Sequence, residues 1–372
     1  MANTLAGRVA TSPRGPQRAN NNSVSEREDL ANFISMITRD ETPFMSSIGK
    51  TKATAIYHEW QTDSLETPGN SRIPEGQDYL APGEDRTTTP AEQVEGAAFN
   101  VIGPFRSRLG NYTQINGKTI AVSGTKRAVD QAGVADEYAY QLKKRGREMR
   151  RDVEADLINT GNFSSAAGVT QNGGARTFGG YQSFINSDSV VRRVGGTTVS
   201  GSNDGTGQVT LAASTSRASL SLSDIDQVMQ DIYEEGGKAS KIMVSPKLRR
   251  DFSDLMVTDS GVRRNIDMDG KLRQSVDIYM SDFGDLMVVP NYIMGLTSPG
   301  TTSGTAGAPG TGDWANAAAL IYDPMWFSIA TLRPLQEVDV GQRGDSTVGM
   351  MVEECTLEVK NPLGCGAIYG LA

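Results

Sequence analysis

Few residues of this 372-residue chain have the type and spacing that catalysis requires. His58 is the single histidine, so any Ser–His or Cys–His mechanism would have to use it. It stands two positions before Trp60 in TKATAIYHEWQTDSL, residues 51–65, whose alternation of polar and apolar residues predicts a strand. We therefore interpret His58 as a structural or surface residue rather than a general base.

The two cysteines, Cys355 and Cys365, stand close together near the end of the sequence. Two cysteines do not make a disulfide framework, and a single histidine cannot join them into a zinc site of the usual kind. We expect both to be reduced thiols in a cytosolic setting.

One fragment resembles a calcium-binding loop. Asn265, Asp267 and Asp269 occupy the first, third and fifth positions of an EF-hand loop, but its twelfth position is Val276 where a bidentate Glu is needed. We therefore favour a solvated turn and treat the three residues as a weak metal candidate. The sequence contains neither GxxxxGKS/T nor GxSxG, and we expect no cofactor.

The densest group of charges lies in residues 134–160, which the sequence predicts to be one long amphipathic helix. Apolar residues recur at steps of four and seven, at Val134, Tyr138, Leu142, Met149, Val153 and Leu157. The opposite face is expected to be ionised by Lys143, Lys144, Arg145, Arg147, Arg150, Arg151, Asp152, Glu154 and Asp156. Direct contact of these bases with nucleic acid is the less favoured interpretation, because no aromatic residues alternate with them and acids follow directly.

Bulk composition narrows the class of protein. The net charge of −8 argues against a protein whose entire surface binds nucleic acid. The 41 glycines predict abundant loops. The N-terminal residues lack the apolar run of a signal peptide, and no stretch approaches the roughly 20 apolar residues of a membrane span. We expect a soluble protein that stays inside the cell that makes it, with no membrane partner.

The first third of the chain contains two unusual segments. Residues 1–25 are polar, with Arg8, Arg14 and Arg18 and no acid, which indicates a disordered tail or an arm that orders on a neighbour. Residues 66–95 carry seven acids against two bases, net −5, and four prolines, between strand-like stretches at 51–65 and 97–114. This arrangement predicts a long projecting hairpin, since loops of this length are uncommon in compact domains.

The pattern of residues 162–372 predicts mixed helices and strands. After a Gly/Ser/Thr-rich stretch at 162–217, we expect a helix over 219–236 capped by Ser223. Strands are expected at 241–246, 274–282, 285–294 and 317–332, a helix at 246–256 and a low-complexity loop at 295–313. The end predicts one long strand, with a bulge at Glu353–Glu354 where the apolar phase changes.

Three classes of function compete. An enzyme needs a convergent polar site, which the sequence does not show, so we expect no enzymatic activity. A monomeric binding module does not need a basic arm (residues 1–25), an acidic hairpin (66–95) and a long charged helix (134–160) together. A self-assembling shell protein does, because each copy must reach its neighbours.

A family resemblance lies in the order of these parts and in the local sequence at 38–65, TRDETPFMSSIGKTKATAIYHEWQTDSL. In both, the chain resembles the major capsid proteins of tailed bacteriophages, which have the HK97-like α+β fold. An encapsulin-like compartment protein is the alternative. The resemblance implies an N-terminal arm at 1–50, an extended hairpin called the E-loop at 51–118 and an axial domain at 219–334. The peripheral domain would comprise 119–218, with its spine helix at 134–160, and the C-terminal strand at 335–372.

The resemblance also implies partners. Copies would form hexamers and pentamers of an icosahedral or prolate shell around double-stranded DNA, held without sequence specificity and assembled in the host cytoplasm. No internal scaffold segment precedes the arm, which implies a separate scaffolding protein, beside a portal and a decoration protein.

From the charges we predict pairing between subunits, with the acidic hairpin of one copy on the helix of the next. The expected contact residues are Arg8, Arg14, Arg18, Glu84, Asp85, Lys143, Lys144, Arg147, Arg150 and Arg151. Any single exposed pair contributes only about 0–1 kcal/mol, so the effect would depend on repetition around each ring.

Overall fold

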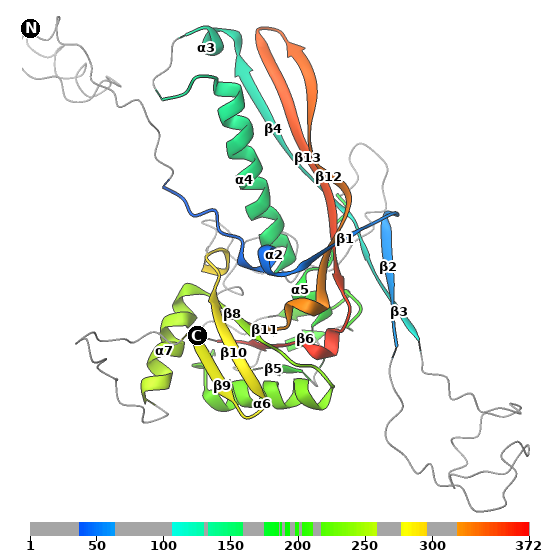
Figure 1. Cartoon of the computed structure of the whole chain (residues 1–372), viewed down its shortest axis with the longest axis vertical. Helices are drawn as coiled ribbons and strands as arrows, with labels where there is room; N and C mark the ends of the chain where they lie inside the picture. The colour runs from blue at the N-terminus through cyan, green and yellow to red at the C-terminus, as the bar shows by residue number, and fades with distance from the viewer. Residues whose placement is uncertain are drawn as a thin grey trace, which may run out of the picture.

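The computed structural model describes residues 37–63, 106–129, 133–158, 175–185, 187, 190–193, 198–200, 203–210, 217–258, 277–295 and 318–371. Two parts are joined end to end, an elongated part and a compact part, and a two-stranded hairpin projects from their junction (Figure 1).

The elongated part is a four-stranded sheet with one long helix against it. Its strand order is β1-β12-β13-β4, formed by Gly49–Lys52, Phe327–Arg343, Ser346–Val359 and Gln114–Ser123. Strand β1 runs parallel to β12, and the other neighbours are antiparallel. Helix α4, Glu137–Leu157, lies along β4 and β13, with the short helix α3, Gly124–Ala128, at the far end.

The apolar stripe in the sequence correctly predicts α4. Met149 and Val153 are buried, and Met149 packs with Ile120 and Met351 of the sheet. The helix begins three residues later than expected, because the carboxylate of Asp136 accepts a hydrogen bond from the amide of Tyr138 and caps the N-terminus.

The compact part is a six-stranded sheet in the order β5-β14-β11-β8-β10-β9, formed by Val191–Arg193, Gly366–Tyr369, Ala318–Tyr322, Lys241–Val244, Gly284–Pro290 and Ile278–Ser281. Helix α6, Leu222–Glu234, packs on β14 and β5, and helix α7, Pro246–Thr258, packs on β8 and β10. The predicted cap of α6 was wrong by two positions, since the Ser221 hydroxyl accepts the bond from the Ser223 amide.

Short elements complete the described residues. The projecting hairpin consists of β2, Tyr57–Thr62, and β3, Ser107–Tyr112. Strands β6, Thr198–Ser200, and β7, Gln208–Thr210, form a second small hairpin. The remaining elements are helices α2, Pro43–Ser47, and α5, Tyr181–Phe184, and the 3₁₀ helices η2, Ile293–Gly295, η3, Pro324–Trp326, and η4, Pro362–Gly364.

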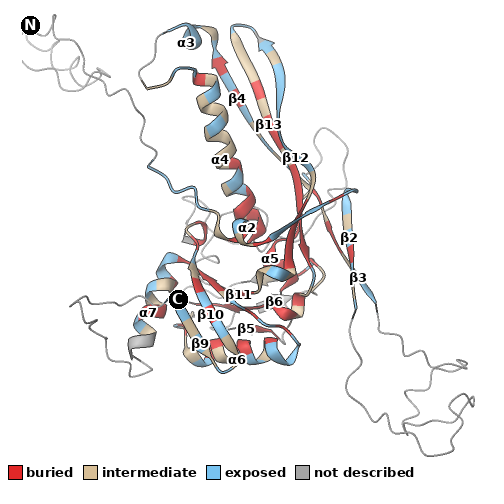
Figure 2. Cartoon of the chain, viewed as in Figure 1, coloured by how far each residue is buried: buried red, intermediate tan, exposed pale blue. Residues whose placement is uncertain are grey.

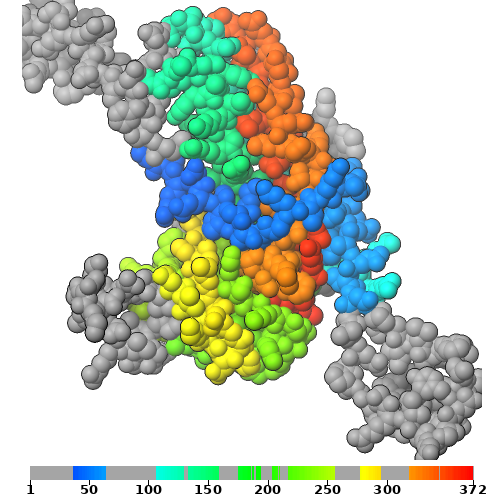
Figure 3. Space-filling view, in the orientation of Figure 1, coloured from blue at the N-terminus to red at the C-terminus, as the bar shows by residue number. Residues whose placement is uncertain are grey.

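The core is densest where the two parts meet (Figure 2). Phe44 of α2 is fully buried there, with its ring edge-on to those of Tyr181, Tyr322 and Phe327 at 5.2–6.0 Å between centroids. In the space-filling view, the segment around α2 and β1 crosses the molecule between the two parts (Figure 3). Residues near 44, which we expected in an N-terminal arm, therefore belong to the core.

Two strand predictions were wrong in detail. The stretch 317–332 is two strands, β11 and β12, because Asp323 caps η3 between them and directs the chain from one sheet to the other. Asn361 likewise caps η4, so β14 is separate from β13 and lies in the compact part.

The bulge predicted in β13 lies in its partner instead. Strand β13 pairs with β4 without interruption, whereas β12 has extra residues between Thr331 and Arg333, between Arg333 and Gln336, and between Asp339 and Gly341. The first of these faces Glu354 and Cys355, close to the place where the apolar phase changes.

Candidate assembly surfaces

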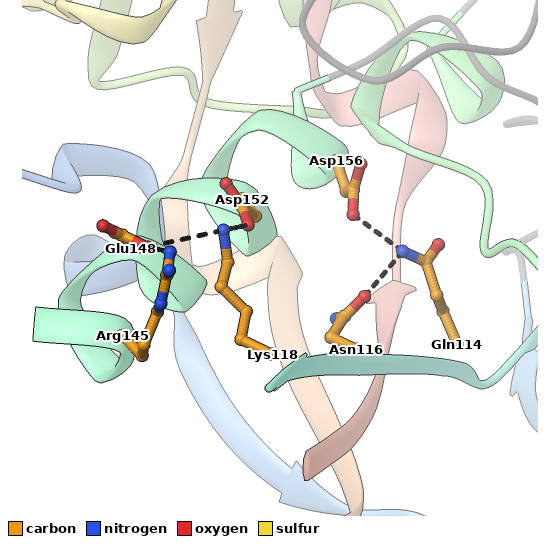
Figure 4. A network of polar contacts seen from close by, with 7 residues as sticks. All are labelled: Gln114, Asn116, Lys118, Arg145, Glu148, Asp152 and Asp156. Carbon is orange, nitrogen blue, oxygen red and sulfur yellow. Dashed lines mark hydrogen bonds and ion pairs between the residues drawn. The ribbon is translucent and has the colours of Figure 1, made fainter. Parts of the chain in front are cut away.

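One flank of α4 is tied to β4 by charged side chains (Figure 4). Nζ of Lys118 lies 2.6 Å from Oδ2 of Asp152 and 3.9 Å from Oε2 of Glu148. Nη1 of Arg145 lies 2.6 Å from the same Glu148 oxygen. These pairs are partly exposed, so each stabilises the fold by about 0–1 kcal/mol and mainly fixes the register of helix on strand.

The last turns of α4 are held by amides rather than by cations (Figure 4). Nε2 of Gln114 donates to Oδ2 of Asp156 at 2.7 Å and to Oδ1 of Asn116 at 2.8 Å. Burial raises the pKa of Asp156 from 3.8 to about 6, and the nearby charge of Asp152 adds to the rise, while the bond from Gln114 opposes it.

Glu154 and Asp156 do not lie on an ionised outer face, contrary to the sequence prediction. Both are buried. Oε1 of Glu154 accepts hydrogen bonds of 2.8 Å from the amide of Phe44 and from Nδ2 of Asn291, and Oε2 accepts one of 2.7 Å from the amide of Met45. Burial raises the pKa of Glu154, and these hydrogen bonds oppose the rise.

This carboxylate caps α2 from a distant part of the chain. Thr42, at the N-cap position of α2, makes no side-chain hydrogen bond to the helix. Glu154 lies 110 positions from Phe44 and supplies the missing acceptor for the first turn. Through Asn291, which directly follows β10, it also bonds to the compact part.

The face of α4 opposite the sheet is basic. The helical period places Lys143, Lys144, Arg147 and Arg151 roughly opposite the buried Met149, with Arg150 at the side. Lys143 and Arg150 are exposed, and the other three are half-buried. Nη1 of Arg147 lies 3.4 Å from Oδ2 of Asp40. Within the described part of the chain, no carboxylate lies within 4.0 Å of the other four basic groups.

A buried acid near the base of the hairpin is neutralised by two arginines. Oε2 of Glu354 accepts from Nε of Arg333 at 2.7 Å, and Oε1 accepts from Nη2 of Arg176 at 2.9 Å and from the hydroxyl of Thr113 at 2.8 Å. Burial alone would raise the pKa of Glu354, but these hydrogen bonds and positive charges lower it below its ordinary value.

The base of the projecting hairpin is anchored to β13. Nε1 of the buried Trp60 donates to the carbonyl of Val359 at 2.8 Å, and Nδ2 of the buried Asn111 donates to the carbonyl of Leu357 at 2.8 Å. The His58 ring lies beside that of Trp60, tilted by 39°, and its Nε2 lies 3.6 Å from Oε2 of Glu358. This position agrees with a structural role for His58.

The cysteines agree with the sequence prediction of free thiols. Cys355 and Cys365 are both unbonded and buried, and burial raises the pKa of Cys365 to about 12. Across the described ranges, no three His, Cys, Asp or Glu side chains are placed to hold a metal ion together. A helix with the length and apolar character of a membrane span is also missing from those ranges.

A profile of the SU10 major capsid protein family matches residues 15–372 of this chain. The chain belongs to that family. This SU10-type capsid protein is also 28% identical, over 260 residues, to the major capsid protein of Escherichia phage Phieco32. That alignment covers 64% of this chain and 68% of the relative.

Solved structures show the same HK97-like fold. The cyanophage P-SCSP1u capsid structure aligns with a TM-score of 0.52 and 10% identity over 93% of each chain. The structure described as Mycobacterium phage Bobi aligns with a TM-score of 0.53 and 11% identity over 92% of this chain and 95% of the other. The protein is thus a major capsid protein of a tailed phage, and it assembles with itself into the shell of the virion.

Several predicted site residues of the capsid protein lie outside the described ranges. They are the arm residues Arg8, Arg14 and Arg18, the hairpin acids Glu84 and Asp85, and the weak metal candidates Asn265, Asp267 and Asp269. Of the predicted contact set, the structure brings together Lys143, Lys144, Arg147, Arg150 and Arg151 on α4.

Sequence reasoning missed the buried carboxylates of Glu154 and Glu354. Each contacts residues far away in sequence, so no local spacing could identify it. Thr42 followed by Pro43 is a favourable helix start in sequence, so the missing side-chain cap of α2 becomes visible only in the structure.

Proposed function

We propose that copies of this capsid protein form hexamers and pentamers of an icosahedral or prolate head, joined in part by an acidic segment of one copy lying on α4 of the next. The observation that carries this proposal is the uneven pairing of α4. On the flank toward β4, the α4 acids Glu148 and Asp152 pair with Lys118 and Arg145. Among the described bases of the outer face, only Arg147 has a carboxylate within 4.0 Å, and Arg150 interacts with Glu353 of β13 over a longer distance.

The acid-rich segment 66–95 supplies the complementary charge, at net −5. The strands that lead to it, β2 and β3, extend away from α4 of the same chain (Figure 1). An intramolecular contact would require the chain to double back past its own junction. A neighbouring copy in a closed shell needs no such reversal, so we assign the contact to Glu84 and Asp85 of one copy and Arg147 and Arg150 of another.

The energy of this contact comes from repetition. An exposed ion pair contributes about 0–1 kcal/mol and is screened over roughly 8 Å at physiological salt. A closed ring repeats the set once per subunit, so the summed bias on assembly exceeds that of any one pair. Assembly should therefore weaken as salt concentration rises.

The proposal includes further partners implied by the resemblance. The polar arm with Arg8, Arg14 and Arg18 would order on a neighbouring copy. A separate scaffolding protein, a portal and a decoration protein would complete the head in the host cytoplasm. The shell would hold double-stranded DNA without sequence-specific contacts, and the protein would act as a structural component rather than an enzyme.

Charge reversal with rescue tests the pairing. Glu84→Lys with Asp85→Lys should reduce the yield of shells seen by negative-stain microscopy, and adding Arg147→Glu with Arg150→Glu to the same chain should partly restore it. Lys247→Glu with Arg250→Glu, on exposed bases of α7, is the matched control and should not restore it. Two additive losses without rescue would show that segment and helix do not meet.

A further inference from the structure

The compact sheet ends in an apolar edge at β9 and β10. Ile278, Met280 and Met287 are 55%, 75% and 51% exposed. Ile278 and Met287 are direct cross-strand partners, and Met280 lies two positions along β9 on the same face. Alternate residues of β10, Leu286 and Val288, point into the core and are buried.

This edge has the features of an interface. Strand β9 is the last of its sheet, and no described strand pairs with its free side. An edge strand leaves backbone donors and acceptors unpaired, and soluble proteins usually protect such an edge with charge. Here the side chains beside the edge are large and apolar, which marks a surface that another molecule covers.

The rim of this edge is acidic. Asp277, Asp282 and Asp285 flank the apolar side chains. The nearby bases are Arg249, whose Nη2 lies 2.8 Å from Oδ1 of Asp277, and Lys241 of β8, the register partner of Met287. Two copies meeting edge to edge at β9 would bring these acids together. The charges therefore disfavour a symmetric pairing and favour a basic partner surface.

The other end of the same sheet has the complementary sign. Strand β5 carries the exposed Arg192 and Arg193, and Nε of Arg192 lies 2.9 Å from Oδ1 of Asp224. Because β5 and β9 are the two ends of one sheet, these surfaces face in opposite directions. Opposed complementary surfaces on one subunit generate head-to-tail contacts, which close into a ring when each copy is rotated by a fixed angle about a common axis and form an open filament when it is not.

We infer that the β9–β10 edge of one capsid protein docks on the β5 edge of the next, in a head-to-tail ring. The inference rests on the proposed assembly into rings and names the surfaces that close them. It is separate from the contact between segment 66–95 and α4, which uses other residues.

Aspartate substitutions at the edge test the apolar contact. Ile278→Asp with Met280→Asp should abolish rings and shells in analytical ultracentrifugation and leave the melting temperature of the subunit within a few degrees of wild type, because both side chains are exposed. Val129→Asp is the matched control, since Val129 is 57% exposed on the elongated part. Unchanged ring formation by the double variant would overturn the inference.

Engineered cysteines test the geometry. Both native cysteines are buried, so Met280→Cys with Arg192→Cys adds the reactive thiols. Oxidation or a short bismaleimide should produce a ladder of covalent species up to the size of the ring, and neither single variant should do so. Dimers formed by Met280→Cys alone, or assembled particles of the double variant without a ladder, would contradict the head-to-tail contact.

The edge contact and the proposed assembly into shells can fail independently. A wild-type chain that stays monomeric at high concentration, both alone and with its scaffolding protein, contradicts both. A wild-type chain that forms shells, with shells equally formed by the aspartate variant, contradicts the edge contact and leaves the proposed assembly standing.

Discussion

The side-chain amide of Asn291 donates a 2.8 Å hydrogen bond to the carboxylate of Glu154, and this bond joins the compact part to the long helix of the elongated part. The same carboxylate accepts the first amides of α2. A single buried group therefore fixes the relative positions of three segments, and it does so without a cation among its hydrogen-bond donors.

Removing this carboxylate should destabilise the subunit strongly. Glu154→Ala leaves the amides of Phe44 and Met45 and the side chain of Asn291 buried without an acceptor, and we expect a loss of about 3–5 kcal/mol in urea unfolding of the unassembled chain. Glu154→Gln keeps one acceptor oxygen and should lose less.

Glu148→Ala on the same helix is the control for this experiment. Its carboxylate is partly exposed and bonds only to Lys118 and Arg145 among the described residues, so we expect a change of about 1 kcal/mol or less. Equal losses for the two alanine variants would contradict a special role for Glu154.

Asp156 should make stability fall as pH rises. Its folded pKa of about 6 exceeds the ordinary 3.8, so the folded state retains a proton that the unfolded chain has released. The stabilisation is complete below about pH 4 and is lost as pH rises to about 6, a difference of roughly 3 kcal/mol. Asp156→Asn should remove this slope, measured as unfolding free energy at several pH values. The same slope in both proteins would contradict the assignment.

A side chain at Gly349 should displace Tyr138. The hydroxyl of Tyr138, which donates to Oε1 of Glu337 at 2.6 Å, occupies the place where a Cβ at position 349 would lie. Tyr138 is only partly buried and can move aside, so Gly349→Ala should cost about 1 kcal/mol through loss of the bond to Glu337. Tyr138→Phe removes the clashing oxygen, so the double variant should lose less than the sum of the single losses. Strict additivity would show that the two residues do not compete for space.

Phe44 should stabilise the folded subunit, whereas residues 1–25 should be needed only for assembly. Phe44→Ala should cost about 3–5 kcal/mol in unfolding free energy, because its ring packs on three buried aromatic rings.

Deleting residues 1–25 should leave the far-UV circular dichroism and melting temperature nearly unchanged while impairing closed shells. An unfolded deletion variant would place those residues in the core.

Local periodicity predicted the long helix well. The spacing of Met149 and Val153 depends only on helical geometry, so it could be read without knowing the rest of the fold. The same geometry predicted that Glu154 faces solvent, because it lies away from the sheet. Contacts from α2 and Asn291 cover that side of the last turns instead.

The remaining errors have the same origin. The phase change at Glu353–Glu354 pointed to a bulge, but sequence cannot say which of two paired strands holds the extra residue. The burial of Glu354 was not predicted, since Arg176 and Arg333, which neutralise it, are distant in sequence. The basic residues of α4 were predicted together because they share one helix.

A cryo-electron microscopy reconstruction of assembled shells would reveal the proposed contact between subunits. We expect residues 66–95 of each copy to lie along the outer face of α4 of an adjacent copy, with Glu84 and Asp85 within ion-pair distance of Arg147 and Arg150. A shell in which segment 66–95 contacts no neighbouring α4, or in which this basic face is open to the packaged DNA, would contradict it.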